Sequence, residues 1–541
     1  PQYLPLTASE VQRRFAVPQG GSPAGAAPSV PGVDNPLRRL FPKVEAPLMP
    51  VPAAEMDAAP GTSPSYTPPA PSRSANVAEG FRAGDWNRIE LLADTNIARA
   101  SINGGRRDAR VTPGGADGYG PVALFVGPGS GEVRFRNYAE KDLGAQLVPR
   151  EANSPAFRGQ KLDDFSYAWD TAVADIDRDG HKDLIAGPYY YLGPDFTRRR
   201  ELYIASTFSP GNQYAANMIT HAEDFTGDGW PDILVTEARQ MALLVNPRGE
   251  PRRWDRHMVV PGNISELTIL ADLDGDGRSE LVMVQGGKVA IAKPRPGAET
   301  EVWPVFVISN ETARLHSFGV GDIDGDGRKD IVQAGGWWKQ PEAGIFASEW
   351  QFHPFIFGNP EHPDERVEGG GEMAVVGVKG GGLADVITSI NAHGFGLAWY
   401  EQRRNGDEIG FVPHLIMGDY RRANPGGLTV SQLHAGVVAA DVDGDGMIDF
   451  FTGKKRWAHL DSHSDPDPSG PAYLLLYRGK KDRAAPGGIR FEPEIISNKA
   501  GAGSALTVED IDGDGRLDVA TSGVDGTWVF QGIKYGKRRQ R

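Results

Sequence analysis

The nine residues 322–330, DIDGDGRKD, decide the fold of this chain. The same pattern recurs five more times, as DIDRDGHKD from Asp175, DFTGDGWPD from Asp224, DLDGDGRSE from Asp272, DVDGDGMID from Asp441 and DIDGDGRLD from Asp510. The starts at positions 175, 224, 272 and 322 are 49, 48 and 50 residues apart. A fixed period of this length indicates an array of repeats, each of them one small structural unit.

The spacing of the motifs indicates a seventh unit. The copies from Asp322 and Asp441 are 119 residues apart, which leaves room for two periods. Residues 376–385, VGVKGGGLAD, are a worn copy in this gap, with Asp385 as their one carboxylate. The apolar runs that follow the motifs are typical of β-strands. The sequence therefore predicts seven β units between residues 146 and 535.

The acidic residues of the motif have the spacing of a calcium loop. Ca²⁺ takes about six to eight oxygen ligands, which carboxylates at positions 1, 3, 5 and 9 and a carbonyl near position 7 would supply. Glycine at position 6 permits the sharp turn. A helical EF-hand is excluded, because its twelfth position needs an acid and five copies have Ala186, Met283, Gln333, Thr452 and Thr521 there.

Six calcium ions would move the formal net charge from −14 to −2. The copy from Asp224 is the weakest, because Thr226 replaces the carboxylate at position 3, and the worn copy is expected to stay empty. The predicted ligands, copy by copy, are Asp175, Asp177, Asp179 and Asp183; Asp224, Thr226, Asp228 and Asp232; Asp272, Asp274, Asp276 and Glu280; Asp322, Asp324, Asp326 and Asp330; Asp441, Asp443, Asp445 and Asp449; and Asp510, Asp512, Asp514 and Asp518.

Composition excludes several classes of function. The chain has 541 residues, with 71 acidic against 57 basic residues, so a nucleic acid is not an expected partner. The lack of cysteine excludes disulfides, thiolate zinc sites and cysteine nucleophiles. No apolar run approaches the roughly 20 residues that a membrane helix needs. The chain begins at Pro1, and we expect a secreted protein, extracellular or periplasmic, whose signal peptide has been removed.

The chain is expected to have four parts. Residues 1–75 contain 16 prolines and predict an extended arm, either a linker or a segment docked on a partner. Residues 76–145 predict a small β segment, 146–535 the repeat array and 536–541 a basic tail.

The β segment resembles a known domain. Gly84-Asp85-Trp86-Asn87 and residues 131–137, GEVRFRN, resemble the last strands of the concanavalin-like jelly roll in 3-keto-disaccharide hydrolases. Strands are expected at 86–92, before the turn at 103–105, at 122–126 and at 132–137. The first half of that domain has no counterpart here, so hydrolase activity is not expected.

The repeats resemble the FG-GAP (VCBS) blades of integrin-type propellers. This resemblance implies an all-β, seven-bladed β-propeller with four-stranded blades, in which each calcium loop joins the first and second strands. A closer resemblance is to the bacterial relatives of the aldos-2-ulose dehydratase propeller, and it implies oxidised sugars as substrates and divalent metals. It rests on residues 187–195 (GPYYYLGPD), 224–232, 335–338 (GGWW), 393–402 (HGFGLAWYEQ), 431–435 (SQLHA) and 453–459 (GKKRWAH). The dehydratase's cupin domains are missing from the chain.

Strand alternation predicts a working face opposite the calcium loops. The residues six or seven positions before each loop, and the segments after each second strand, should open onto this face. The former include Trp169, Glu266, His316, Glu372 and His434. His316 and His434 could hold a divalent transition metal with Glu266 or Glu372, or they could be ordinary channel histidines.

Other residues of the same face could serve catalysis. His393, Lys455, Arg456 and His459 could bind a carboxylate, steady an enolate or move a proton, or form a basic surface loop. Trp337 and Trp338 could stack on a sugar or pack between blades.

Two functions follow from these expectations. The first is a carbohydrate-directed protein, acting as a metal-dependent carbon–oxygen lyase or dehydratase of keto-sugars. The second is a non-catalytic subunit of an extracellular or periplasmic assembly, docked on another protein through its arm and propeller rim.

Overall fold

The computed structural model describes residues 81–94, 97–103, 108–111, 133–136, 150–208, 213–237, 239–262, 264–313, 316–361, 367, 369–380, 382–459, 465–468 and 470–534. The chain divides into two units, Pro1–Asn76 and Val77–Arg541. The proline-rich arm and the basic tail lie outside the described residues. In the described part, no helix has the length and apolar character needed to cross a membrane.

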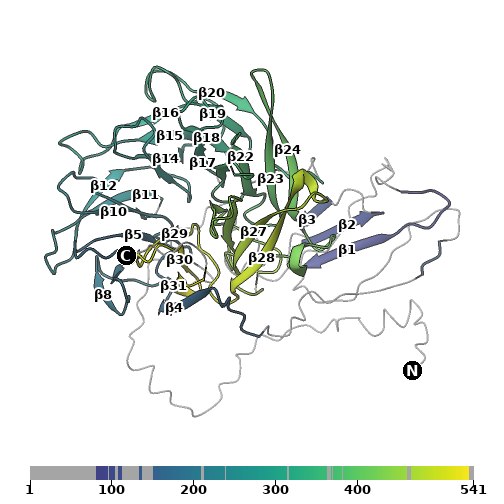
Figure 1. Cartoon of the computed structure of the whole chain (residues 1–541), viewed down its shortest axis with the longest axis horizontal. Coiled ribbons are helices and arrows are strands. Elements are labelled where there is room, and N and C mark those ends of the chain that lie inside the picture. Colours follow the sequence, from purple (N-terminus) through teal and green to yellow (C-terminus); the bar gives the residue numbers. More distant parts are fainter. Residues whose placement is uncertain are drawn as a thin grey trace, which may run out of the picture. The chain divides into compact units, whose positions relative to one another are not determined.

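Seven four-stranded antiparallel sheets are arranged around a centre and form a seven-bladed β-propeller (Figure 1). Among the described residues, two single-turn 3-10 helices, Pro425–Gly427 and Pro486–Gly488, lie between strands. Blade 1 is β5 (Ala172–Ala174), β6 (Asp183–Ala186), β7 (Tyr189–Leu192) and β8 (Arg198–Glu201). Blade 2 is β9 (Thr220–Glu223), β10 (Asp232–Glu237), β11 (Gln240–Val245) and β12 (Asp255–Val260). Blade 3 is β13 (Ile269–Ala271), β14 (Glu280–Gln285), β15 (Lys288–Ala292) and β16 (Val305–Val307).

The remaining blades have the same order of strands. Blade 4 is β17 (Gly319–Gly321), β18 (Asp330–Gln333), β19 (Gly336–Lys339) and β20 (Gln351–Pro354). Blade 5 is β21 (Ala374–Val376), β22 (Asp385–Ser389), β23 (Leu397–Asn405) and β24 (Glu408–Met417). Blade 6 is β25 (Val438–Ala440), β26 (Asp449–Gly453), β27 (Leu474–Lys481) and β28 (Ile489–Ser497). Blade 7 is β29 (Thr507–Glu509), β30 (Asp518–Gly523), β31 (Gly526–Gly532) and β4 (Phe157–Asp163).

The core lies between neighbouring blades. Successive side chains of a strand point to opposite faces of its sheet, and β14 shows the result. Leu281 and Met283 pack in the cluster shared with blade 2, whereas Val282 and Val284 pack in the cluster shared with blade 4. This is why the second strands read as nearly continuous apolar runs.

Blade 7 closes the ring with strands from both ends of the array. β31 pairs with β4, the first strand of the propeller, in a register that places Phe157 opposite Gly532. The predicted seven blades are confirmed, and blade 5 forms around the worn copy at residues 376–385.

The nine-residue loops share two features. Glycine at position 6 has a positive φ in every intact copy, from 83° at Gly446 to 90° at Gly515, a conformation that other residues rarely adopt. The acid at position 9 is buried and accepts backbone N–H bonds. In blade 4 the oxygens of Asp330 accept from Ile323 and Gln340, each at 2.9 Å. Asp385 does the same in the worn copy, with Val378 at 3.2 Å and Gln402 at 2.8 Å.

A separate three-stranded sheet forms before the propeller, from β1 (Ile89–Asp94), β2 (Ile97–Ile102) and β3 (Asp108–Val111). The prediction of a strand at 132–137 is wrong for residues 133–136, the part of this segment that the structure describes. Residues 133–136 have no regular secondary structure, and all four are exposed, with Val133 55% and Phe135 54% accessible. Alternating residues form a strand only where a partner strand takes up their backbone groups. The strand expected at 122–126 lies outside the described residues.

Candidate functional site

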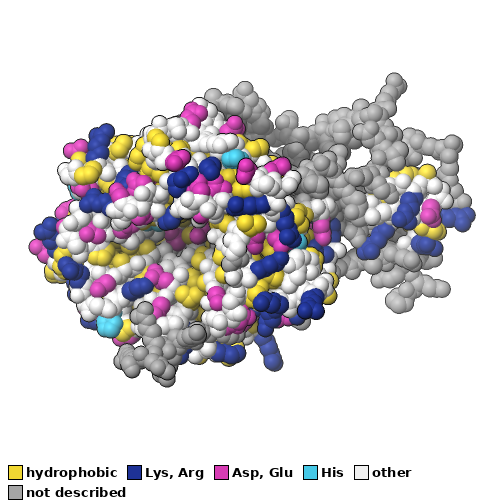
Figure 2. All heavy atoms as spheres, turned by 45° about the horizontal axis from the view of Figure 1, so that its top comes forward, with side chains coloured by type: hydrophobic (Ala, Val, Ile, Leu, Met, Phe, Trp, Pro, Cys, Tyr) yellow, Lys and Arg dark blue, Asp and Glu magenta, His cyan; other side chains and the backbone are white. Residues whose placement is uncertain are grey.

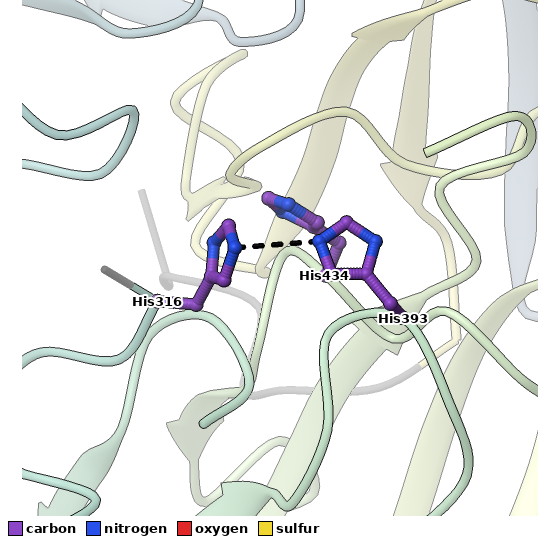
Figure 3. A group of neighbouring side chains, drawn as sticks. All are labelled: His316, His393 and His434. Carbon is purple, nitrogen blue, oxygen red and sulfur yellow. Dashed lines mark hydrogen bonds between the residues drawn. The ribbon is translucent and has the colours of Figure 1, made fainter. Parts of the chain in front are cut away.

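Three histidine rings converge at one end of the propeller channel (Figure 3). The ring centroids are 4.9 Å apart for His316 and His434, 5.0 Å for His316 and His393, and 5.3 Å for His393 and His434. The Nε2 atoms of His316 and His393 are 3.3 Å apart. The structure thus brings together three residues that the sequence marks as candidates.

The topology explains this convergence. His316 and His434 precede the first strands β17 and β25, whereas His393 lies in the turn between β22 and β23. Parallel bridges join neighbouring blades before their first strands, as between Phe318 and Glu372 and between Glu372 and Gly436. The starts of the first strands therefore lie at one end of the channel. The nine-residue loops follow those strands and lie at the other end, as predicted.

Glu266 joins the histidines to a buried lysine. Its Oε1 atom contacts His434 Nε2, and lies 3.8 Å from His316 Nδ1 and 3.3 Å from Lys455 Nζ. The side chain of Lys455 is only 3% exposed. Its ammonium group also lies 3.2 Å from Ser504 Oγ and 3.9 Å from the centroid of the Trp169 ring. A carboxylate and an aromatic face therefore stabilise a lysine that water barely reaches.

Asp465 orients two more rings. Its Oδ1 atom is 2.7 Å from His459 Nδ1, and its Oδ2 atom is 3.4 Å from His393 Nδ1. The rings of His393 and His459 are stacked, with centroids 3.6 Å apart. A carboxylate bonded to Nδ1 leaves Nε2 of the same ring available as a metal ligand.

Burial and charge set the protonation of this cluster. Burial lowers the pKa of His316 to about 4 and that of His434 to about 3. Burial alone would raise the pKa of Glu266, but Lys455 and the two histidines hold it well below its usual value. Burial lowers the pKa of Lys455, against the opposing effect of Glu266. The cluster therefore combines neutral imidazoles with an ionised carboxylate, as a metal site requires.

The spacing of the ligand atoms fits a tetrahedral divalent ion. Two nitrogens bound at about 2.0–2.1 Å in tetrahedral geometry lie roughly 3.3 Å from each other, which matches the distance between His316 and His393. One ligand atom from each of the three histidines lies within 4.8 Å of the others. His434 Nδ1 is buried and has no hydrogen-bond partner among the described residues. Imidazole and carboxylate ligands suit Zn²⁺ and related transition metals.

Several candidates lie elsewhere. Arg456 forms an ion pair with Asp525 at 2.6 Å and lies over Trp457, so its charge is compensated by a carboxylate outside the histidine cluster. Of the two alternatives for Trp337 and Trp338, packing between blades is the one that the structure has. The two residues are 3% and 1% exposed and pack into the cores on either side of blade 4, because strand alternation turns both rings into blade interfaces.

Two residues near the site were missed from the sequence. Asp465 follows a polar segment with no periodic pattern, and the density of His and Asp in this segment is the one sequence signal that could have found it. Tyr214 is 47% exposed and packs edge-on against Trp169 at 5.6 Å. Burial raises the pKa of Tyr214, and so do the charges of Glu266 and Asp465. Its ring is therefore an accessible aromatic surface within electrostatic reach of the cluster.

A family model of the FG-GAP-like repeat matches residues 272–332. The match begins at the loop of blade 3 and ends in the second strand of blade 4. The chain thus carries an FG-GAP-like repeat. No curated protein sequence matches it.

Solved structures resemble the chain at low identity. A lectin from Agrocybe aegerita that recognises non-reducing terminal N-acetylglucosamine is 15% identical, with a TM-score of 0.36, over 76% of this chain and 90% of the lectin. The exotype rhamnogalacturonan lyase YesX is 14% identical, with a TM-score of 0.38, over 71% of this chain and 75% of the lyase. BBS1N, solved in complex with ARL6DN, is 11% identical, with a TM-score of 0.38, over 72% of this chain and 100% of BBS1N. A shared fold at these identities does not imply a shared activity.

The FG-GAP-like loops have the donor set of a hard cation. Asp175, Asp177 and Asp179 bring carboxylate oxygens within 4.8 Å of one another, as do Asp272, Asp274 and Asp276. Asp177 Oδ1 and Asp510 Oδ1 are buried and have no hydrogen-bond partner in the described part of the chain. Unpartnered buried carboxylate oxygens in an all-oxygen set fit Ca²⁺.

Acidic and basic side chains are interspersed over the face of the blades seen in Figure 2.

Proposed function

We propose that this propeller acts on carbohydrate through a divalent transition metal at the histidine end of its channel. The reaction proposed is the elimination of water from an oxidised sugar. One observation carries the proposal, namely the convergence of His316, His393 and His434 beside Glu266. A bound ion would polarise the carbonyl oxygen of the sugar.

His459 is the residue best placed to move a proton. Its Nδ1 is bonded to Asp465, and 43% of its side chain is exposed, so Nε2 would take the proton from the carbon beside the carbonyl. The hydroxyl group on the next carbon then takes this proton from His459 and leaves as water, and a carbon–carbon double bond forms between the two carbons. Lys455 would offset the negative charge that develops on the substrate oxygen. Tyr214 offers a ring on which a sugar could stack.

An elimination assay tests this proposal. Protein loaded with Zn²⁺ or Mn²⁺ is mixed with keto-glycosides, and the conjugated product is followed by its ultraviolet absorbance. His459→Ala should lower kcat by about 10²-fold or more while the bound metal is retained. His257→Ala, on the outer strand β12, serves as a control. Loss of the metal without any effect on sugar binding or turnover would contradict the proposal.

A non-catalytic role in an assembly is the second candidate. It is favoured by the proline-rich sequence of residues 1–75, which has too few apolar residues to form a core of its own. Limited proteolysis of the purified complex tests it. Removal of the arm should release a partner protein, and retention of every partner after cleavage would count against docking.

We also propose that calcium in the FG-GAP-like loops stabilises the propeller and that the protein works outside the cytosol, in the extracellular space or periplasm. Calcium modules of extracellular proteins work at the high concentrations found there. Because an ion that binds only the folded state adds stability, excess EGTA should lower the Tm. An unchanged melting curve would contradict a structural role for calcium.

A further inference from the structure

One position on the third strand of each blade is equivalent in all seven. The residue after the acid at position 9 pairs with a third-strand residue, as Ile331 pairs with Trp338 and Phe450 with Tyr477. The next residue along that third strand is here called the facing residue. In chain order the facing residues are Leu192, Val245, Lys293, Lys339, Glu401, Arg478 and Gln531.

In three blades the facing residue is basic and contacts the loop carboxylates. Lys293 Nζ lies 2.9 Å from Asp274 and 2.8 Å from Asp276. In blade 4, Lys339 contacts Asp324 and lies 3.1 Å from Asp326. In blade 6, Arg478 contacts Asp443. The contacted acids are at positions 3 and 5 of the motif, so the basic group lies among the carboxylates that a calcium ion would need.

Blade 5 has the same contact with its charges exchanged. Position 3 of the worn copy is Lys379, and it forms an ion pair with the facing residue Glu401. This blade has lost every acidic ligand except Asp385, and yet it keeps the four strands of the others. An ion pair at this position is therefore compatible with a complete blade that lacks the carboxylates at positions 1, 3 and 5.

Blades 1 and 7 have no basic facing residue. Leu192 is 3% exposed and packs in the apolar core with Ile176. In blade 7, the neutral amide of Gln531 donates to Asp512 at 3.0 Å, and the loop has a local basic contact, from Arg516 at its position 7 to Asp514. These two loops contain the buried, unpartnered oxygens of Asp177 and Asp510.

Blade 2 differs from both groups. Its facing residue is Val245, but Thr226 stands where the other copies have the carboxylate of position 3, and Arg248 pairs with Asp228 at 2.9 Å.

We propose that Lys293, Lys339 and Arg478 take the place of calcium in blades 3, 4 and 6, so that calcium binds only the loops of blades 1 and 7. This inference rests on the calcium role proposed above. Lys293 and Lys339 already compensate the carboxylates at positions 3 and 5, and Arg478 compensates those at positions 3 and 9. Each basic group would repel a divalent ion placed beside it. The stability of those three blades is then independent of calcium.

Counting bound calcium tests the inference. Native mass spectrometry and equilibrium dialysis with radioactive calcium should each find two ions per chain. Lys293→Leu should add one ion, because it frees the loop of blade 3, and Leu192→Lys should remove one. Lys288→Leu, a lysine at the other end of β15, should leave the count unchanged. Lys293→Leu could fold poorly in the absence of calcium. In that case, calcium should restore its Tm, and this recovery would likewise show that the freed loop of blade 3 binds the ion.

The possible failures are distinguishable. Six ions in the natural protein, with no response to Lys293→Leu, would overturn this inference and leave the calcium role intact. No calcium in the natural protein or in Lys293→Leu would overturn the calcium role itself. A folded Leu192→Lys variant that still binds two ions would contradict the assignment of the first site.

Discussion

His316 and His393 hold their Nε2 atoms 3.3 Å apart, although 77 positions separate them in the chain. His316 stands before the first strand of blade 4 and His393 in the turn after the second strand of blade 5. Two imidazole nitrogens at this distance need either a proton or an ion between them, since two lone pairs would repel each other. The metal proposal can therefore be tested directly, by measuring whether an ion binds between these two nitrogens.

Asp465→Asn should weaken metal binding without unfolding the protein. The carboxylate is 3.4 Å from Nδ1 of His393, and a bond of this kind holds the ring in the orientation and tautomer that a ligand needs. Loss of such a partner lowers metal affinity by about 10–100-fold. Titration with Zn²⁺ followed by calorimetry measures the change. His257→Ala should bind zinc as the natural protein does, and an equal loss in both variants would show that the effect is not local.

Removal of Glu266 should destabilise the propeller through Lys455. Glu266→Ala leaves a lysine with a 3% exposed side chain without the carboxylate 3.3 Å away. Breaking a buried ion pair by removing one partner costs about 3–5 kcal/mol. Denaturant unfolding should show this loss. The double variant Glu266→Ala with Lys455→Met should recover much of it, because no uncompensated charge remains, and failure to recover would contradict the pairing.

Asp170 should make stability fall as the pH rises. Burial raises its pKa to about 8 from the ordinary 3.8, although it accepts a hydrogen bond from the Thr220 N–H at 2.9 Å. The folded protein therefore binds this proton more tightly than the unfolded chain. Its contribution to stability is complete below about pH 4 and is lost as the pH rises through about 8.

Asp170→Asn isolates this effect, because the amide oxygen can still accept the Thr220 N–H. The difference in the free energy of unfolding between variant and natural protein should change in favour of the variant between pH 4 and pH 8. A constant difference across this range would show that Asp170 titrates normally.

Asp385 should matter for stability even though its loop has no other acid. Asp385→Ala leaves the N–H groups of Val378 and Gln402 without their acceptor inside the protein. Each buried unsatisfied group costs about 1–3 kcal/mol. The loss should be equal in EGTA and in calcium, as measured by urea unfolding. Asp407→Ala, in the exposed turn between β23 and β24, should change little.

Gly159→Val should loosen the closure of the ring. A Cβ atom at Gly159 would lie 2.7 Å from Cε1 of Phe530, the residue opposite it in β31. Overpacking of this kind costs about 1–3 kcal/mol and should lower the Tm. Gly410→Val in β24 is the matched control, since a Cβ atom there meets nothing within 4 Å. Equal Tm values of the two variants would show that the packing between β4 and β31 does not determine the stability of the propeller.

The number and type of blades could be predicted because each blade has a loop with strict local requirements. Gly327 is needed for its positive φ of 86°, and Asp330 is needed to accept two N–H groups. These requirements are met within nine consecutive residues, so the sequence shows them directly. Asp385 survives in the worn copy for the same reason, which is a role in backbone bonding that the calcium interpretation of position 9 overlooked.

Two features could not be predicted from the sequence. One is the pairing of β4 with β31 that closes the ring, and the other is the set of contacts that Asp465 makes with the histidines. β4 reads FRGQKLD, and as an outer strand only its two ends are buried, so it lacks an apolar pattern. Asp465 meets His393 across 72 positions, from segments with no shared periodicity. The register of His316 and His434 before their loops was visible, because equivalent positions of repeats meet at a propeller axis. The spacing offered both Glu266 and Glu372 as partners of these histidines, and side-chain reach, which spacing does not show, decides that Glu266 makes the contacts.

The pairing of β4 with β31 gives the propeller a mechanical weak point. Phe157 is opposite Gly532, so the chain enters and leaves the ring at neighbouring points on one ladder. A force that draws these two points apart loads the hydrogen bonds of the ladder one after another, from that end, as a zip opens. The other six sheets are each a continuous stretch of chain and would not bear the load until blade 7 had opened. Tension applied through the two ends of the propeller would thus open the ring at a single seam, at a lower force than if all the bonds of the ladder were loaded together.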